Sequence, residues 1–272
     1  MWETLLPLFG FLVGIASSLV GIGGGTFIVP ILLIMYGFSP TQLATGTSLT
    51  AIVFTAVAST INYWRQKRIY FKTGLVLAVT TVPGAVLGAF LADMLESHML
   101  AFIFGFFLIF MAARMMIDLN KLRAESHGPR DSREESFVKS DAETYSSRKT
   151  VAWGAGLSFF GGLASGLLGI GGGVLVVPIM MFAFGMPIHI ATATSMFTMI
   201  FTSTAAVPKY CTAGHINLEY ALLLAAGSIL GAQIGAYTSK RVSGKNLRRM
   251  FAVILVIVGV KMLFDNRIVL GF

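Results

Sequence analysis

The residues best suited to chemistry in this sequence are glycines, which form one turn that occurs twice. Residues 21–25 and residues 169–173 both read Gly-Ile-Gly-Gly-Gly. Glycines let backbone N–H groups converge on a ligand, and the start of a following helix adds unpaired donors and partial positive charge. The pattern therefore predicts two halves of one binding site for a small anion. The alternative is a tight hairpin that only packs against its neighbours.

Hydroxyl residues follow each turn at the same spacing, in residues 44–48 and 191–195. They would add hydrogen-bond donors to the same cavity, although hydroxyls in membrane helices often only satisfy backbone carbonyls. The predicted substrate-binding residues are Gly21, Gly23, Gly24, Gly25, Thr26, Thr45, Thr47, Ser48, Gly169, Gly171, Gly172, Gly173, Thr192, Thr194 and Ser195.

The turns belong to a repeat that fills nearly the whole chain. Gly21 corresponds to Gly169 at an offset of 148 residues, and from residues 44–48 onward the offset is 147. Such long-range self-similarity indicates two copies of one structural unit. We expect the first membrane repeat at 1–118, a polar cytoplasmic linker at 119–150 and the second repeat at 151–272.

Composition indicates a helical membrane protein. Hydrophobic residues make up 56% of the 272 residues, charged residues 12%, and the mean hydropathy is +0.80. Several apolar segments reach about 20 residues, the length that a helix needs to cross a bilayer. The net charge of +8 does not indicate nucleic-acid binding, because the basic residues lie in short loops. A single cysteine, Cys211, excludes an internal disulfide.

The fold class that we predict is an all-α polytopic membrane protein with two inverted repeats. Each repeat contains a glycine-rich hairpin with a short helix, followed by three transmembrane helices. The first short helix would begin at Thr26 or at Pro30 and end at Tyr36. The other expected helices are 4–20, 42–64, 73–92 and 98–118 in the first half, and 151–168, a short helix to 184, 188–210, 218–238 and 248–264 in the second.

The loop charges set the expected orientation. Residues 65–72, Arg114 with the linker, and residues 240–249 contain 17 of the 20 lysines and arginines. Basic loops stay on the cytoplasmic side of a membrane. All three segments can be cytoplasmic only if the two halves cross the membrane in opposite senses. Both termini are then expected outside the cytoplasm.

The duplicated turn, the Val-Pro that follows it (Val29-Pro30 and Val177-Pro178) and the Ala-Thr-x-Thr-Ser clusters resemble the sulfite exporter TauE/SafE family of membrane permeases. The resemblance covers residues 5–118 and 151–265. It implies export of small sulfur-containing anions, such as sulfite or organosulfonates, across the bacterial cytoplasmic (inner) membrane.

The expected mechanism is alternating access around an anion site at the membrane midplane, with a proton or sodium ion as a possible coupling ion. The sequence predicts no catalytic residue, cofactor or metal ligand set, so we do not expect an enzyme. Two alternatives remain open at this point: a passive anion channel, and a membrane protein with a structural or sensory role.

Overall fold

The computed structural model describes residues 5–95 and 148–239, with isolated positions between 99 and 113 and between 249 and 260. Over these residues the chain is helical and has no strand. The helices are α1 (Leu6–Val20), α2 (Gly25–Met35), α3 (Thr41–Arg65), α4 (Phe71–Met94), α7 (Arg148–Leu168), α8 (Gly173–Ala183), α9 (Ile188–Thr212) and α10 (Leu218–Thr238).

Helix lengths fall into two classes. The four helices α3, α4, α9 and α10 are long and apolar enough to cross a membrane. Helices α2 and α8 have 11 residues each, or about 16 Å at 1.5 Å per residue, roughly half of the hydrocarbon thickness. The predicted all-helical polytopic chain and its short helices are therefore confirmed, while the inverted orientation in a membrane stays a prediction.

Most helix bounds lie within two residues of the predicted ones, and two starts differ in a way that matters. Helix α2 begins at Gly25, so Pro30 lies inside it rather than at its first turn. Gly24 adopts a left-handed conformation that closes the turn, and its carbonyl oxygen already accepts from two N–H groups of the helix. Helix α7 begins at Arg148, three residues inside the expected linker. The helices expected at 98–118 and 248–264 lie outside the described residues apart from the isolated positions.

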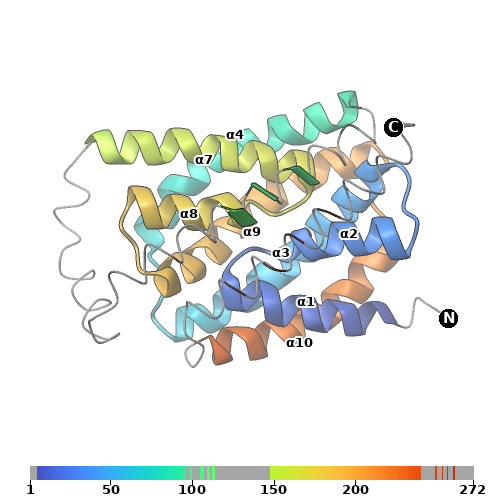
Figure 1. Cartoon of the computed structure of the whole chain (residues 1–272), viewed down its shortest axis with the longest axis horizontal. Coiled ribbons are helices and arrows are strands. Elements are labelled where there is room, and N and C mark those ends of the chain that lie inside the picture. Colours follow the sequence, from blue (N-terminus) through green and yellow to red (C-terminus); the bar gives the residue numbers. More distant parts are fainter. Residues whose placement is uncertain are drawn as a thin grey trace.

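Helix pairs from different halves form the two flanks of the molecule (Figure 1). Helix α1 packs along α10, and α4 packs along α7, with α3 and α9 in contact between them. Close approach depends on glycine: a Cβ on Gly84 or Gly88 would overlap backbone carbonyl oxygens of α7, and one on Gly231 would overlap the carbonyl oxygen of Phe11. Gly84 and Gly88, four residues apart on α4, thus allow the close packing of α4 against α7.

Equivalent residues of the two halves make equivalent contacts. The Tyr63 hydroxyl of α3 donates to the carbonyl oxygen of Ser18 in α1. At an offset of 147, the Tyr210 hydroxyl of α9 donates to the carbonyl oxygen of Gly166 in α7, at 2.6 Å. Each central helix is thus anchored in the same way to the helix before a glycine turn.

The helix ends gather at two poles. The ends of α3 and α10 meet, since Gln66 Nε2 donates to the Ala236 carbonyl oxygen at 3.0 Å and Arg68 Nη1 donates to Ser239 Oγ at 3.1 Å. The ends of α9 and α4 meet at the other pole, which includes the start of α10. There, Lys209 Nζ lies 2.5 Å from a carboxylate oxygen of Asp93.

Candidate functional site

The two glycine turns have the same backbone geometry. Helix α1 ends at Gly21, which has φ 81°, and its N–H donates to the Ser17 carbonyl oxygen at 2.7 Å. Gly169 ends α7 with φ 72° and donates to the Ser165 carbonyl oxygen at 2.9 Å. These residues therefore redirect the chain between a long helix and a short one.

The start of each short helix is uncapped. Gly24 (φ 80°) precedes α2, and Gly172 (φ 89°) precedes α8, and neither helix start receives a side-chain hydrogen bond. The first N–H groups of a helix have no partner within the helix, and L-residues with side chains rarely adopt such φ values. Glycine here both permits the turn and leaves the helix start open.

The turns lie against each other, while their role as one binding site stays a prediction. A Cβ on Gly25, the first residue of α2, would overlap the carbonyl oxygen of Gly169 and lie 2.7 Å from Cα of Ile170. Likewise, a Cβ on Gly173, the first residue of α8, would overlap the carbonyl oxygen of Gly21. The first residue of each short helix therefore touches the turn of the other half.

The hydroxyl clusters cross over between the halves. Ser48 Oγ of α3 donates to the carbonyl oxygen of Gly169 at 3.0 Å, and Ser195 Oγ of α9 donates to the carbonyl oxygen of Gly21 at 2.7 Å. Thr192 Oγ1 also donates across the halves, to the carbonyl oxygen of Val20 at 3.2 Å. Each cluster thus fixes the turn of the opposite half, an exchange that the sequence did not predict.

Two predicted threonines bind backbone N–H groups at the starts of long helices. Thr47 Oγ1 accepts from the N–H of Asn217 at 2.9 Å, immediately before α10. Thr194 Oγ1 accepts from the N–H of Tyr70 at 3.0 Å, immediately before α4. These hydroxyls have a structural role in the conformation described.

Three buried hydroxyls beside the turns have no hydrogen-bond partner in the described part of the chain. They belong to Thr26 in the first turn of α2, to Thr45, and to Ser165. A Cβ on Gly169 would lie 2.9 Å from Cα of Thr45, and one on Gly172 would lie 3.6 Å from Ser165 Oγ. Ser165 was not predicted from the sequence, although it corresponds to Ser17 at the offset of the turns.

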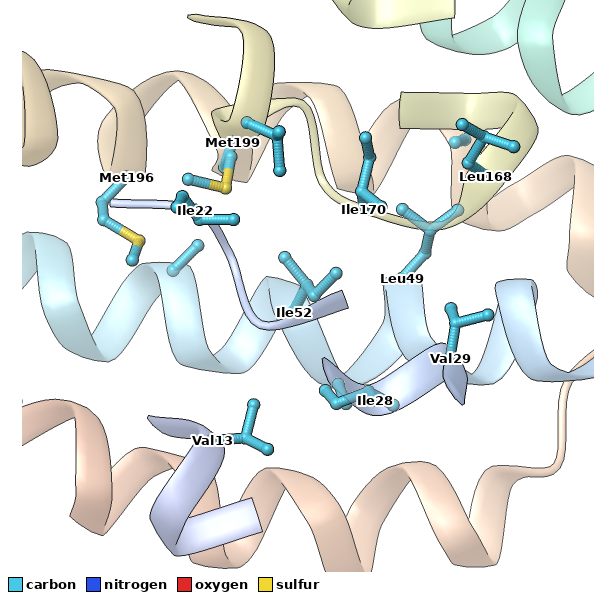
Figure 2. Packing of buried hydrophobic residues seen from close by; sticks show 14 of the residues in the cluster. Val13, Ile22, Ile28, Val29, Leu49, Ile52, Leu168, Ile170, Met196 and Met199 are labelled. Carbon is cyan, nitrogen blue, oxygen red and sulfur yellow. The ribbon is translucent and has the colours of Figure 1, made fainter. Parts of the chain in front are cut away.

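The predicted site residues are all buried, and Figure 2 shows buried apolar side chains packed at the centre of the molecule, among them Ile22 and Ile170. Ile22 and Ile170, in the second position of each turn, are 3% and 0% exposed. Where the structure describes burial, no lysine, arginine, aspartate or glutamate is buried. Any attraction for an anion at the turns would therefore come from backbone and hydroxyl dipoles.

A charged cluster that the sequence did not predict lies at the end of α9. Asp93 pairs with Lys209, and a second carboxylate oxygen lies 3.3 Å from Nδ1 of His215. Lys209 Nζ also lies 4.8 Å from the ring centre of Phe90. Lys209 is thus engaged at one pole of the molecule and is not a binding residue at the turns.

Comparison with known proteins agrees with the resemblance drawn from the motifs. The family described as Sulfite exporter TauE/SafE matches residues 6–262. A probable membrane transporter protein of Bacillus subtilis, YunE, is 30% identical over 96% of this chain and 97% of its own length. A probable membrane transporter protein of Methanocaldococcus jannaschii, MJ0441, is 29% identical over 95% of this chain and 94% of its own length. No solved structure matches.

The matched region includes both glycine turns, both hydroxyl clusters and all the described helices. The described helices include four that can cross a membrane, as a permease requires. The chain belongs to the sulfite exporter TauE/SafE family of membrane transporters.

Proposed function

We propose that this protein transports small anions and that the two turns hold the anion between them. The observation that carries the proposal is that the uncapped starts of α2 and α8 each touch the turn of the other half. The positive ends of two helix dipoles then act on one volume, which favours negative charge. The hydroxyls of Thr26, Thr45 and Ser165 supply further donors without breaking an existing hydrogen bond.

We assign the substrate to small sulfur-containing anions such as sulfite or organosulfonates. This assignment rests on membership of the family. Such anions carry several oxygen acceptors around one sulfur atom, and they match a site that offers several donors and no fixed ammonium or guanidinium group. Backbone donors at helix starts bind oxyanions of this kind through geometry rather than through a full opposite charge.

The proposed mode of transport is alternating access by two inverted repeats in the cytoplasmic membrane. Support comes from the pole where the ends of α3 and α10 meet, because the basic segments 65–72 and 240–249 follow these ends. With this pole cytoplasmic, the linker is cytoplasmic and both termini are outside. A proton or sodium gradient would drive net movement.

Purified protein in detergent provides the first test. The melting temperature should rise with sulfite or with two- and three-carbon sulfonates, and not with a neutral solute of similar size. Thr26→Val should abolish most of this rise and leave the melting temperature without ligand unchanged, because the hydroxyl has no partner among the described residues and Val174 occupies the equivalent position.

Ser59→Ala is the matched control, since it removes a buried hydroxyl that donates only within α3. It should keep the full response to ligand. If no anion stabilises the wild-type protein, the anion site is refuted and a structural or sensory role is favoured.

Reconstituted liposomes then separate a transporter from a passive channel. An imposed proton or sodium gradient should drive the anion against its own gradient. Anion movement that only ever follows the anion gradient would identify a channel that uses the same site.

A further inference from the structure

Two apolar side chains fill the space between the glycine turns. They are Ile52 of α3 and Met199 of α9, which correspond to each other at the offset of 147 residues. Ile52 is 0% exposed and Met199 is 1% exposed. Figure 2 shows both side chains directed into the region where the two turns approach each other.

Met199 contacts both turns. A Cβ on Gly23 would overlap its sulfur, and one on Gly173 would lie 2.5 Å from its terminal methyl carbon. A Cβ on Gly171 would lie 3.2 Å from the same sulfur. Glycine at these three positions therefore leaves the room that the thioether occupies.

Ile52 occupies the other side of the same space. A Cβ on Gly25 would lie 2.8 Å from its Cδ1, and one on Gly171 would lie 3.0 Å from its Cγ2. Together, Ile52 and Met199 cover the glycines from both sides. In the conformation described, both side chains lie against the glycines, so an anion that binds between the turns would have to displace at least one of them.

The two side chains differ in how easily they can move. Isoleucine is branched at Cβ, and in a helix it strongly prefers a single χ1 rotamer. Methionine is unbranched and has three rotatable bonds, so it fits irregular spaces and changes conformation at low cost. This difference favours Met199 over Ile52 as the side chain that moves.

We propose that Met199 is the gate of the anion site: its side chain swings out to admit the anion, and the space that it vacates limits the size of the anion. This inference rests on the proposed function. It names a specificity-determining residue that the glycine and hydroxyl motifs do not include. The thioether of Met199 is also uncharged, so the backbone dipoles of the turns would remain the main source of attraction for the anion.

Two substitutions at position 199 test the gate in liposomes. Met199→Ala removes the side chain and should raise the uptake of a three-carbon sulfonate relative to sulfite by roughly 10-fold or more, the size discrimination that an apolar pocket can supply. Met199→Ile keeps an apolar side chain but restricts χ1, so it should slow the uptake of every anion about 10-fold or more, the scale of the same steric effect.

The matched control is Met180→Ala, which truncates another fully buried methionine in a separate cluster around α8. It should leave the ratio of the two uptake rates unchanged. If Met199→Ala does not fold, Met199→Ile decides the question by itself, because it alters shape with little change in volume.

The outcomes separate the gate from the proposed function. A wild-type protein that moves no anion overturns the proposed function. A wild-type protein that moves anions, with rates and size ratio unchanged by both Met199 substitutions, overturns the gate alone. A change of the size ratio in Met180→Ala equal to that in Met199→Ala would also overturn the gate.

Discussion

At the scale of single residues, the hydroxyl groups near the turns divide by what they bind. Ser48 and Ser195 donate to carbonyl oxygens of the opposite turn. Thr26, Thr45 and Ser165 are buried without a partner in the described structure. Buried polar groups are usually satisfied, and the exceptions need an explanation. A ligand that supplies the missing acceptors is the explanation that the proposed function offers.

The serines should contribute to stability in equal measure. Ser48→Ala and Ser195→Ala each remove a buried hydrogen bond to a turn carbonyl oxygen, at a cost of roughly 1 to 2 kcal/mol in the free energy of unfolding. Their losses at the turns should be similar, because these two bonds are equivalent in the repeat. Ser195 Oγ also lies 2.8 Å from the carbonyl oxygen of Thr192 in its own helix. Denaturant unfolding in detergent measures the free energy of unfolding of both variants. Ser59→Ala is the comparison, because it removes a buried hydroxyl that bonds within α3 and not to a turn. An unchanged unfolding midpoint in either serine variant would contradict this role.

At the scale of elements, the flanks of the molecule depend on helices that touch through their backbones. Gly162 of α7 meets the backbone of Thr81 in α4, where a Cβ would overlap the carbonyl oxygen. Small residues allow such close approach between membrane helices and contribute to their association by dispersion and dipole contacts. The flanks can therefore hold the turns in place without charged pairs in the interior.

Helix α7 offers two glycines for a paired test of this packing. Gly162→Ala should destabilise the protein by roughly 1 to 3 kcal/mol, because the added carbon forces α4 and α7 apart. Gly156→Ala should instead stabilise it by about 0.5 to 1 kcal/mol, since nothing lies within 4 Å of the added carbon. Melting temperatures in detergent measure both. Equal shifts of the same sign would contradict the packing argument.

At the scale of the whole molecule, the structure separates two poles. One contains the joined ends of α3 and α10. The other contains the Lys209–Asp93 pair at the ends of α9 and α4. With the proposed orientation, the first pole is cytoplasmic and the second is outside. The two repeats would then present opposite ends of equivalent helices to each side of the membrane.

The only cysteine of the chain reports this orientation directly. Cys211 is exposed near the end of α9, so a membrane-impermeant maleimide should label it in intact cells that express the protein. In a Cys211→Ser background, Arg65→Cys at the end of α3 should be labelled only after the membrane is permeabilised. Labelling of both positions from the same side would refute the inverted orientation, whatever the substrate is.

The sequence by itself determined the membrane character, the duplication and the approximate positions of the described helices, most bounds falling within two residues of those in the structure. The length of each apolar segment and the composition of each loop indicate these features locally. Because the chain is duplicated, both halves give the same indication. It also singled out the glycines that follow α1 and α7 and precede α2 and α8, because few other residues adopt the positive φ that these turns require. Family membership followed from the same motifs and is confirmed by the match over residues 6–262.

Only the tertiary structure decided which residues meet. The exchange of Ser48 and Ser195 between the halves and the filling of the centre by Ile52 and Met199 depend on how the helices pack. So does the Ser165 hydroxyl, which has no partner in the described part of the chain. The two serine hydrogen bonds join positions more than 100 residues apart, and neither spacing nor propensity specifies them. The physical reason is that membrane helices associate through the close fit of their surfaces, and the surfaces that meet are defined only in the assembled bundle.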